Sequence, residues 1–207
     1  MSYQVENETL PSGFRVVVEL DSYPESPRDW DNLGKVVLVD RCRYTFGDEV
    51  ASNEELREIG LDDELLKLPI YLYDHSGITI NTSGFSCPWD SGMVGMIYMT
   101  KQTAIENWGK KILTKQVRDK AYACLRAEIE CLDQYITGSV YGYRVFDPQG
   151  DELDSCWGFY GAAADCLNEG KSVAQHYEEQ AQKERAEVAY WQTRDIETIG
   201  ASHAANH

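Results

Sequence analysis

Residues 114–136 constrain the fold most, because they predict one long amphipathic helix more clearly than any other stretch of the sequence. Apolar side chains recur there every three or four residues, which is the spacing of a single helix face: Val117, Ala121, Cys124, Leu125, Ile129, Leu132 and Ile136. A stripe of this length needs a matching apolar surface, and alternating β-branched runs lie on both sides of it in the chain. The pattern predicts an α+β fold with a mainly antiparallel sheet packed by this helix.

Strands are predicted where short apolar runs are bounded by glycine, proline or asparagine: residues 14–20, 35–44, 69–74, 78–81, 92–100, 140–146 and 153–159. Two short helices have their own start signals. Ser52 and Glu55 have the spacing of a capping box, and Thr100 is a good N-cap residue. The first helix should end at Gly60, with one more helical turn at residues 62–66.

We expect one domain over residues 1–207. Within it, residues 1–12 are polar and predict a loose arm, and residues 14–161 predict the core. Residues 162–199 are rich in alanine, glutamate and glutamine and predict a peripheral C-terminal helical appendage, in two pieces on either side of Gly170. Residues 200–207 predict a frayed tail.

The charge of the chain favours a basic partner. There are 35 acidic and 19 basic residues, for a net charge of −16. Direct binding to nucleic acid is disfavoured, because such binding depends on Lys and Arg displacing counterions. Two acidic segments are the candidate partner-binding surfaces, since rows of carboxylates can imitate duplex phosphates. Their members are Glu54, Glu55, Glu58, Asp62, Asp63, Glu64, Glu178, Glu179, Glu184 and Glu187.

The compartment follows from what the sequence lacks. Six cysteines occur without a CxxC pair, which favours free thiols in a reducing cytoplasm. The N-terminus has no basic and apolar leader, and no run of about 18 apolar residues predicts a membrane span. No cofactor is expected.

An alternative is a small hydrolase or nucleic-acid-modifying enzyme. Asp74, His75, Cys87 and Asp90 lie within one short stretch, and they supply the residue types of a thiol hydrolase. His75, Cys87 and Asp90 are its candidate catalytic residues. A second alternative is a metal site with Asp29, Asp31 and Asp74 as oxygen ligands, although the glycine and glutamate of a calcium loop are absent at the needed spacing.

Self-association is a further alternative. It would use an apolar stripe on the C-terminal helix: Val173, Tyr177, Ala181, Val188 and Trp191.

Four motifs carry a resemblance to a family: LPIYLYDHSGITI, FSCPWDSGMVGMIYMTK, DQYITGSVYGYRV and ELDSCWGFYG. In this order they resemble a family of proteins encoded by bacteriophages and other mobile elements, over about residues 28–161. The resemblance implies a protein made in the host cytoplasm, with no virion role. It transfers no catalytic or binding residue.

Charge and resemblance together predict a non-enzymatic accessory protein. It would bind a host protein with a basic groove and occlude it, in the manner of a nucleic-acid mimic. A nucleic-acid-handling defence complex, such as a restriction or CRISPR complex, is the expected target.

Overall fold

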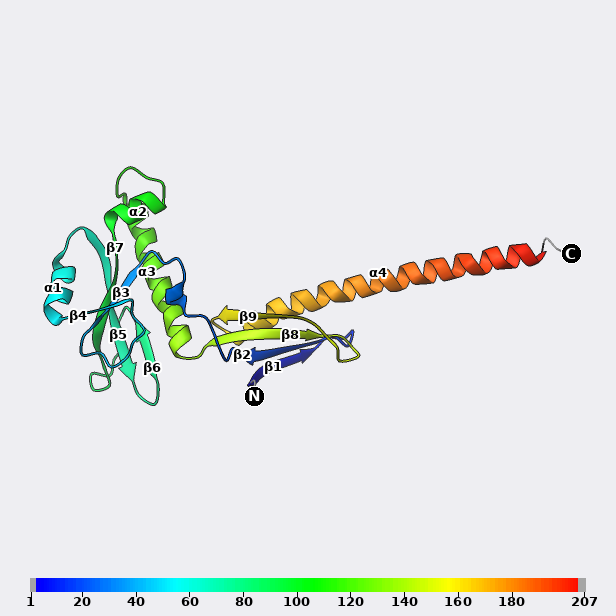
Figure 1. Ribbon diagram of the computed structural model, residues 1–207, viewed down its shortest axis with the longest axis horizontal. Helices are drawn as coiled ribbons and strands as arrows, with labels where there is room; N and C mark the ends of the chain where they lie inside the picture. Colours follow the sequence, from blue (N-terminus) through cyan, green and yellow to red (C-terminus); the bar gives the residue numbers. More distant parts are fainter. Residues whose placement is uncertain (1–2, 205–207) are drawn as a thin grey trace. The chain divides into compact units, whose positions relative to one another are not determined.

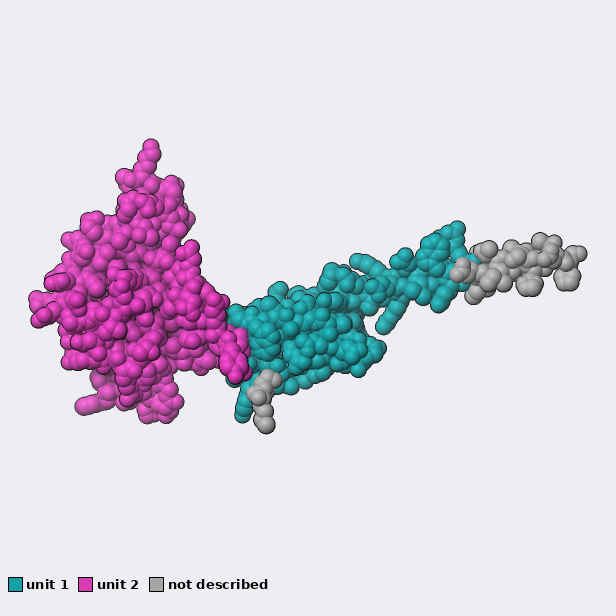
Figure 2. All heavy atoms as spheres, in the orientation of Figure 1, with its two compact units in different colours: residues 1–20, 141–207 teal, residues 21–140 magenta. Residues whose placement is uncertain are grey.

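The chain divides into two compact units, coloured separately in Figure 2. The computed structural model describes residues 3–204, and it describes side chains for all of these except 193 and 195–204. Unit 1 is Met1–Leu20 with Tyr141–His207, and unit 2 is Asp21–Val140. The described residues contain four α-helices and nine strands in two sheets, mostly antiparallel. The fold is therefore α+β, as the sequence predicts, but the strands form two sheets rather than one.

Unit 1 is a four-stranded sheet covered by the start of a long helix (Figure 1). The strand order is β1 (Gln4–Thr9), β2 (Arg15–Leu20), β8 (Val140–Phe146) and β9 (Glu152–Tyr160). Helix α4 (Ala163–Ala204) packs its first half on this sheet. The buried side chains between helix and sheet are Leu10, Phe14, Val16, Val18, Tyr143, Val145, Cys166 and Ala174.

Two expectations for unit 1 need correction. Residues 1–12 are not a loose arm, because β1 pairs antiparallel with β2 from Gln4 to Thr9. The strand is held by backbone hydrogen bonds at the sheet edge, so its polar side chains can remain in water. The C-terminal helix is also unbroken at Gly170, and its first half belongs to the core. It runs to Ala204, through most of the expected frayed tail, and residues 205–207 lie outside the described residues.

Unit 2 is a five-stranded sheet in the order β4-β3-β7-β5-β6. The strands are β3 (Lys35–Val39), β4 (Glu49–Ala51), β5 (Leu65–Asp74), β6 (Ile78–Asn81) and β7 (Ser91–Thr100). Strands β3 and β4 are parallel, and the other pairs are antiparallel. Residues 62–66 are not a helical turn as expected, because β5 already begins at Leu65 and pairs with the end of β7.

Helices cover the two faces of this sheet differently (Figure 1). Helix α3 (Lys115–Ile136) buries its apolar stripe against the face that carries Val36 and Leu38. Helix α1 (Asn53–Leu61) packs Leu56 against Val37, which alternates with those residues and so points to the other face. Helix α2 (Lys101–Asn107) and a 3-10 turn, η1 (Pro27–Asp29), complete the unit.

The predicted start signals of these helices are confirmed. Ser52 and Glu55 form a reciprocal capping box at α1, and Thr100 caps α2, as predicted; the structure adds a third cap, Thr114, at the start of α3. Each cap satisfies an orphan backbone N–H at the start of its helix.

Candidate functional site

The turn after β5 and the loop before β7 bring together the predicted catalytic residues. Asp74 ends β5, and its N–H donates to the backbone carbonyl of Asp90 at 2.8 Å. His75 opens the turn into β6, while Cys87 lies three residues before Asp90. Pairing of β5 with β7 therefore places His75, Cys87 and Asp90 at one end of unit 2.

The Asp90 carboxylate lies at the centre of this group. The Cys87 thiol donates to its Oδ2 atom at 3.6 Å, and His75 Nδ1 lies 3.6 Å from the same oxygen. A thiol hydrolase needs the imidazole at the thiol, where it can take the proton. No hydrogen bond joins Cys87 to His75 in the described structure. The order of contacts is thiol, carboxylate, imidazole, so the nucleophile–base pair is not formed.

Asp74 is directed to other partners. Its carboxylate forms an ion pair with Arg43 and accepts a hydrogen bond from the Tyr44 hydroxyl at 2.8 Å. The hydrogen bond with Tyr44 and the charge of Asp74 raise the pKa of Arg43. Asp74 thus holds the segment after β3 against the end of β5, and this position is structural.

The alternative metal ligands are not gathered. No group of three His, Cys, Asp or Glu side chains with metal-binding geometry occurs among the described residues. Asp29 and Asp31 are exposed, while Asp74 binds Arg43. The loop around Asp29 is held by its neighbours instead: the Asn32 amide donates to the carbonyls of Pro27 and Trp30 at 2.8 and 2.9 Å.

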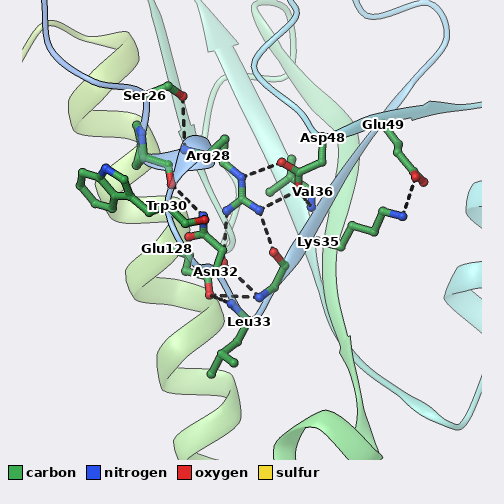
Figure 3. A network of polar contacts seen from close by, with 12 residues as sticks. Ser26, Arg28, Trp30, Asn32, Leu33, Lys35, Val36, Asp48, Glu49 and Glu128 are labelled. Carbon is green, nitrogen blue, oxygen red and sulfur yellow. Dashed lines mark hydrogen bonds and ion pairs between the residues drawn. The ribbon is translucent and has the colours of Figure 1, made fainter. Parts of the chain in front are cut away.

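A partly buried network of hydrogen bonds and ion pairs surrounds Arg28 in unit 2 (Figure 3). Arg28 donates to both carboxylate oxygens of Asp48, at 3.0 and 2.6 Å, and to Glu128 at 3.1 Å. Glu128 Oε1 also accepts the N–H groups of Leu33 and Gly34 at 3.0 Å each.

The Arg28 network is structural. Burial lowers the pKa of Arg28, and the hydrogen bonds and charges of Asp48 and Glu128 raise it further than burial lowers it. Sequence reasoning missed this network, although one signal was present. Glu128 is a charged residue four positions after Cys124 and four before Leu132, on the apolar side of α3.

Some carboxylates of the acidic segment 54–64, which covers α1 and the turn after it, have partners within the unit. Glu55 closes the capping box, which lowers its pKa, and Asp62 Oδ1 accepts the N–H of Glu64 at 2.8 Å. Glu64 in turn lies 3.3 Å from Lys101. Half of the six predicted carboxylates therefore have structural partners, and the exposed remainder is Glu54, Glu58 and Asp63.

The acidic segment on α4 is more open. Glu178 is half-buried and accepts a hydrogen bond from Gln182 at 3.2 Å. Beyond it, every side chain from residue 182 to residue 192 is exposed. Glu184 and Glu187 share this stretch with three large apolar side chains. These are Val188, Tyr190 and Trp191, which are 54%, 52% and 54% exposed.

Comparison of the chain with protein-family models, with curated proteins and with solved structures finds no match. In the described part of the chain, no helix has the length and apolar composition that crossing a membrane requires.

Proposed function

We propose that the protein is a non-enzymatic binding protein that docks on a basic groove of a nucleic-acid-handling host protein and occludes it. The observation that carries the proposal is the exposed stretch of α4 at residues 182–192. There the carboxylates of Glu184 and Glu187 lie on the same short stretch of helix as Tyr190 and Trp191. Aromatic anchors beside charged groups are typical of protein-binding surfaces.

Charge supports the choice of partner. The chain has a net charge of −16, so long-range attraction speeds its encounter with a positively charged groove. Once docked, carboxylates and buried aromatic side chains occupy the space that nucleic-acid phosphates and bases would fill. The resemblance to proteins of bacteriophages and mobile elements adds the setting, which is the cytoplasm of a host cell and its defence complexes.

Affinity capture with the full chain tests this proposal. The chain is immobilised, bacterial lysate is applied at about 0.1 M and 0.5 M salt, and captured proteins are identified by mass spectrometry. We expect a nucleic-acid-binding protein that is released at the higher salt. Adding the full chain to this isolated partner should then displace its DNA or RNA in a mobility-shift assay.

Variants locate the surface. Glu179→Gln with Glu184→Gln and Glu187→Gln should weaken capture, as should Trp191→Ala. The matched control removes three carboxylates from unit 2: Glu54→Gln, Glu58→Gln and Asp63→Asn. The assignment to α4 is wrong if only the control loses capture. If the chain instead binds itself, light scattering will show a dimer that Trp191→Ala dissociates, and the proposed role as an inhibitor then fails.

A further inference from the structure

The face of the unit 2 sheet that α1 covers is only partly closed. Helix α1 has nine residues, and it buries Leu56 against Val37 and Ala51. Met96 is half-buried on the same face, and Met93 is 45% exposed. This face therefore keeps an opening between the start of α1 and the middle of β7.

A cavity of about 270 Å³ occupies that opening. Its walls come from the end of β3, from the first half of α1 and from β7. The lining residues are Val39, Arg41, Asn53, Leu56, Arg57, Met93, Val94, Gly95 and Met96. Two arginines thus face a surface that is otherwise mainly apolar, and methionine side chains adapt readily to the shape of a ligand.

The two arginines stand out against the charge of the whole chain. Among the residues that the structure describes, no aspartate or glutamate lines the cavity, although the chain has 35 acidic residues. Arg41 is oriented by donating to the Asn53 side-chain oxygen at 3.1 Å. Arg57 forms no ion pair within 4.0 Å with the described residues, and its neighbours Glu54 and Glu58 are not part of the lining.

We infer that this cavity binds a carboxylate attached to a small apolar group. The guanidinium is the side chain best suited to a carboxylate, which it can contact through two parallel N–H groups. The volume lies just below the range of about 300–1,000 Å³ of typical ligand pockets, so the ligand is a single aromatic or aliphatic group with its carboxylate. A free organic acid and the C-terminal residue of a peptide share this chemistry. The inference is independent of the proposed role of α4, which belongs to unit 1.

Methionine methyl NMR of the full chain tests this inference, with sodium phenylacetate as the probe. We expect saturable shifts of the Met93 and Met96 methyl signals, while 2-phenylethanol, which has the same ring and no charge, leaves them in place. Arg41→Gln with Arg57→Gln should weaken binding by at least about tenfold, because it removes both charge-assisted contacts. The matched control, Arg118→Gln with Arg126→Gln, removes two exposed arginines from α3 and should leave the affinity unchanged.

Comparing a peptide with phenylacetate distinguishes a peptide C-terminus from a free organic acid as the natural ligand. Acetyl-Gly-Phe with a free carboxylate should bind more tightly than phenylacetate if the natural ligand is a peptide C-terminus, and more weakly if it is a free acid. The inference is overturned if phenylacetate produces no saturable shift up to about 10 mM, a concentration well above the Kd expected of a specific site. The inference is also rejected if acetyl-Gly-Phe with an amidated C-terminus binds as tightly as the free acid form of the peptide. It is rejected as well if Arg118→Gln with Arg126→Gln weakens binding as much as Arg41→Gln with Arg57→Gln does.

Discussion

At the scale of single residues, Glu128 shows how a charged group can stabilise the interior. Its side chain and that of Arg28 are only 12% and 10% exposed. Without Glu128, Arg28 keeps its two hydrogen bonds to Asp48 but loses the second carboxylate that compensates its mostly buried charge, and such a loss is costly. Here the cost extends to the backbone, because the N–H groups of Leu33 and Gly34 also depend on Glu128.

We therefore predict that Glu128→Ala lowers the free energy of unfolding by about 3 kcal/mol. The measurement is urea unfolding followed by circular dichroism. Glu130→Ala is the matched control, because Glu130 is exposed on the same helix, and it should change stability by less than about 0.5 kcal/mol. Equal effects of the two substitutions would show that the network contributes nothing of its own.

The cysteines should differ sharply in reactivity. Burial, and then the charge of Glu128, raise the pKa of Cys124 to about 11, and burial raises that of Cys166 to about 12. Cys156 is exposed. We predict that a thiol reagent at pH 8 modifies Cys156 first, and that Cys124 and Cys166 react only after unfolding, because the thiolate is the reactive form. Peptide mass spectrometry after timed labelling measures the order, and early labelling of Cys166 would contradict it.

The same shifts determine how stability depends on pH. An unfolded thiol ionises near its ordinary pKa of 9.0, whereas these two thiols stay neutral in the folded chain to higher pH. Since both folded pKa values are raised, their contribution is complete below pH 9 and is lost as the pH rises toward 11–12. Chemical unfolding at pH 8 and at pH 10.5 should show lower stability at the higher pH, and replacing both by alanine should reduce the difference.

At the scale of elements, Gly170 explains why α4 can lie so close to its sheet. A Cβ atom at this position would lie 2.6 Å from Val16 Cγ1 and 3.0 Å from Tyr143 Cγ. Glycine inside a helix costs about 1 kcal/mol relative to alanine, so the close approach must outweigh that cost. The helix continues through this glycine because packing, rather than propensity, decides its conformation here.

We predict that Gly170→Ala destabilises the chain by about 1–2 kcal/mol, even though alanine is the better helix former. Combining it with Val16→Ala should recover part of the loss, since the double variant removes the closest atom. The test is a double-mutant cycle from urea unfolding. Additive effects of the two substitutions would mean that the predicted clash does not occur.

Elements with strong local patterns could be predicted from the sequence. The stripe of residues 114–136 and the caps at Ser52 and Thr100 depend on neighbours within four residues, and each lies where expected. Strand β1 could not be predicted, because its side chains are mostly polar and its pairing with β2 leaves no apolar signal. Gly170 resembled a helix end because its contact partner, Val16, is far away in the chain.

The candidate site was predictable in composition but not in geometry. Pairing of β5 with β7 brings His75, Cys87 and Asp90 together, and their place within one short stretch of the sequence indicated this grouping. The position of the Asp90 carboxylate between Cys87 and His75 depends on the geometry of the turns. The residue types alone do not specify that geometry. The contact between Arg28 and Glu128 spans 100 positions, so only the odd placement of a glutamate on an apolar helix face could indicate it.

At the scale of the whole molecule, acidic charge is spread over both units, whereas the chain path separates them into an inserted unit and an interrupted one. Both units are acidic: residues 21–140 contain 20 acidic and 13 basic residues, and the remainder contains 15 and 6. The topology is nested, because unit 2 is continuous and interrupts unit 1 between Leu20 and Tyr141. A sequence pattern read from one end to the other contains no sign of this nesting.

The nesting predicts that each unit folds alone. The ends of unit 2 are joined, because the Asp21 N–H donates to the Val140 carbonyl at 2.9 Å, and both of its hydrophobic clusters lie within residues 21–140. The ends of unit 1 also meet, since Leu20 and Tyr141 are register partners in adjacent antiparallel strands. A turn of about two to four residues, such as Asn-Gly, can therefore replace the whole of unit 2.

We expect residues 21–140 alone, and residues 1–20 joined through such a turn to residues 141–207, each to show a dispersed NMR spectrum and cooperative urea unfolding. Each short chain keeps its own sheet and the helices packed on it, which is the condition for independent folding. The proposed binding surface lies on α4, so the joined chain should retain partner capture, while residues 21–140 should retain binding of phenylacetate. The prediction is wrong if residues 21–140 fold alone but the joined chain of residues 1–20 and 141–207 does not. In that case unit 1 depends on unit 2 through the connection at Leu20 and Tyr141, and the two units are not independent domains.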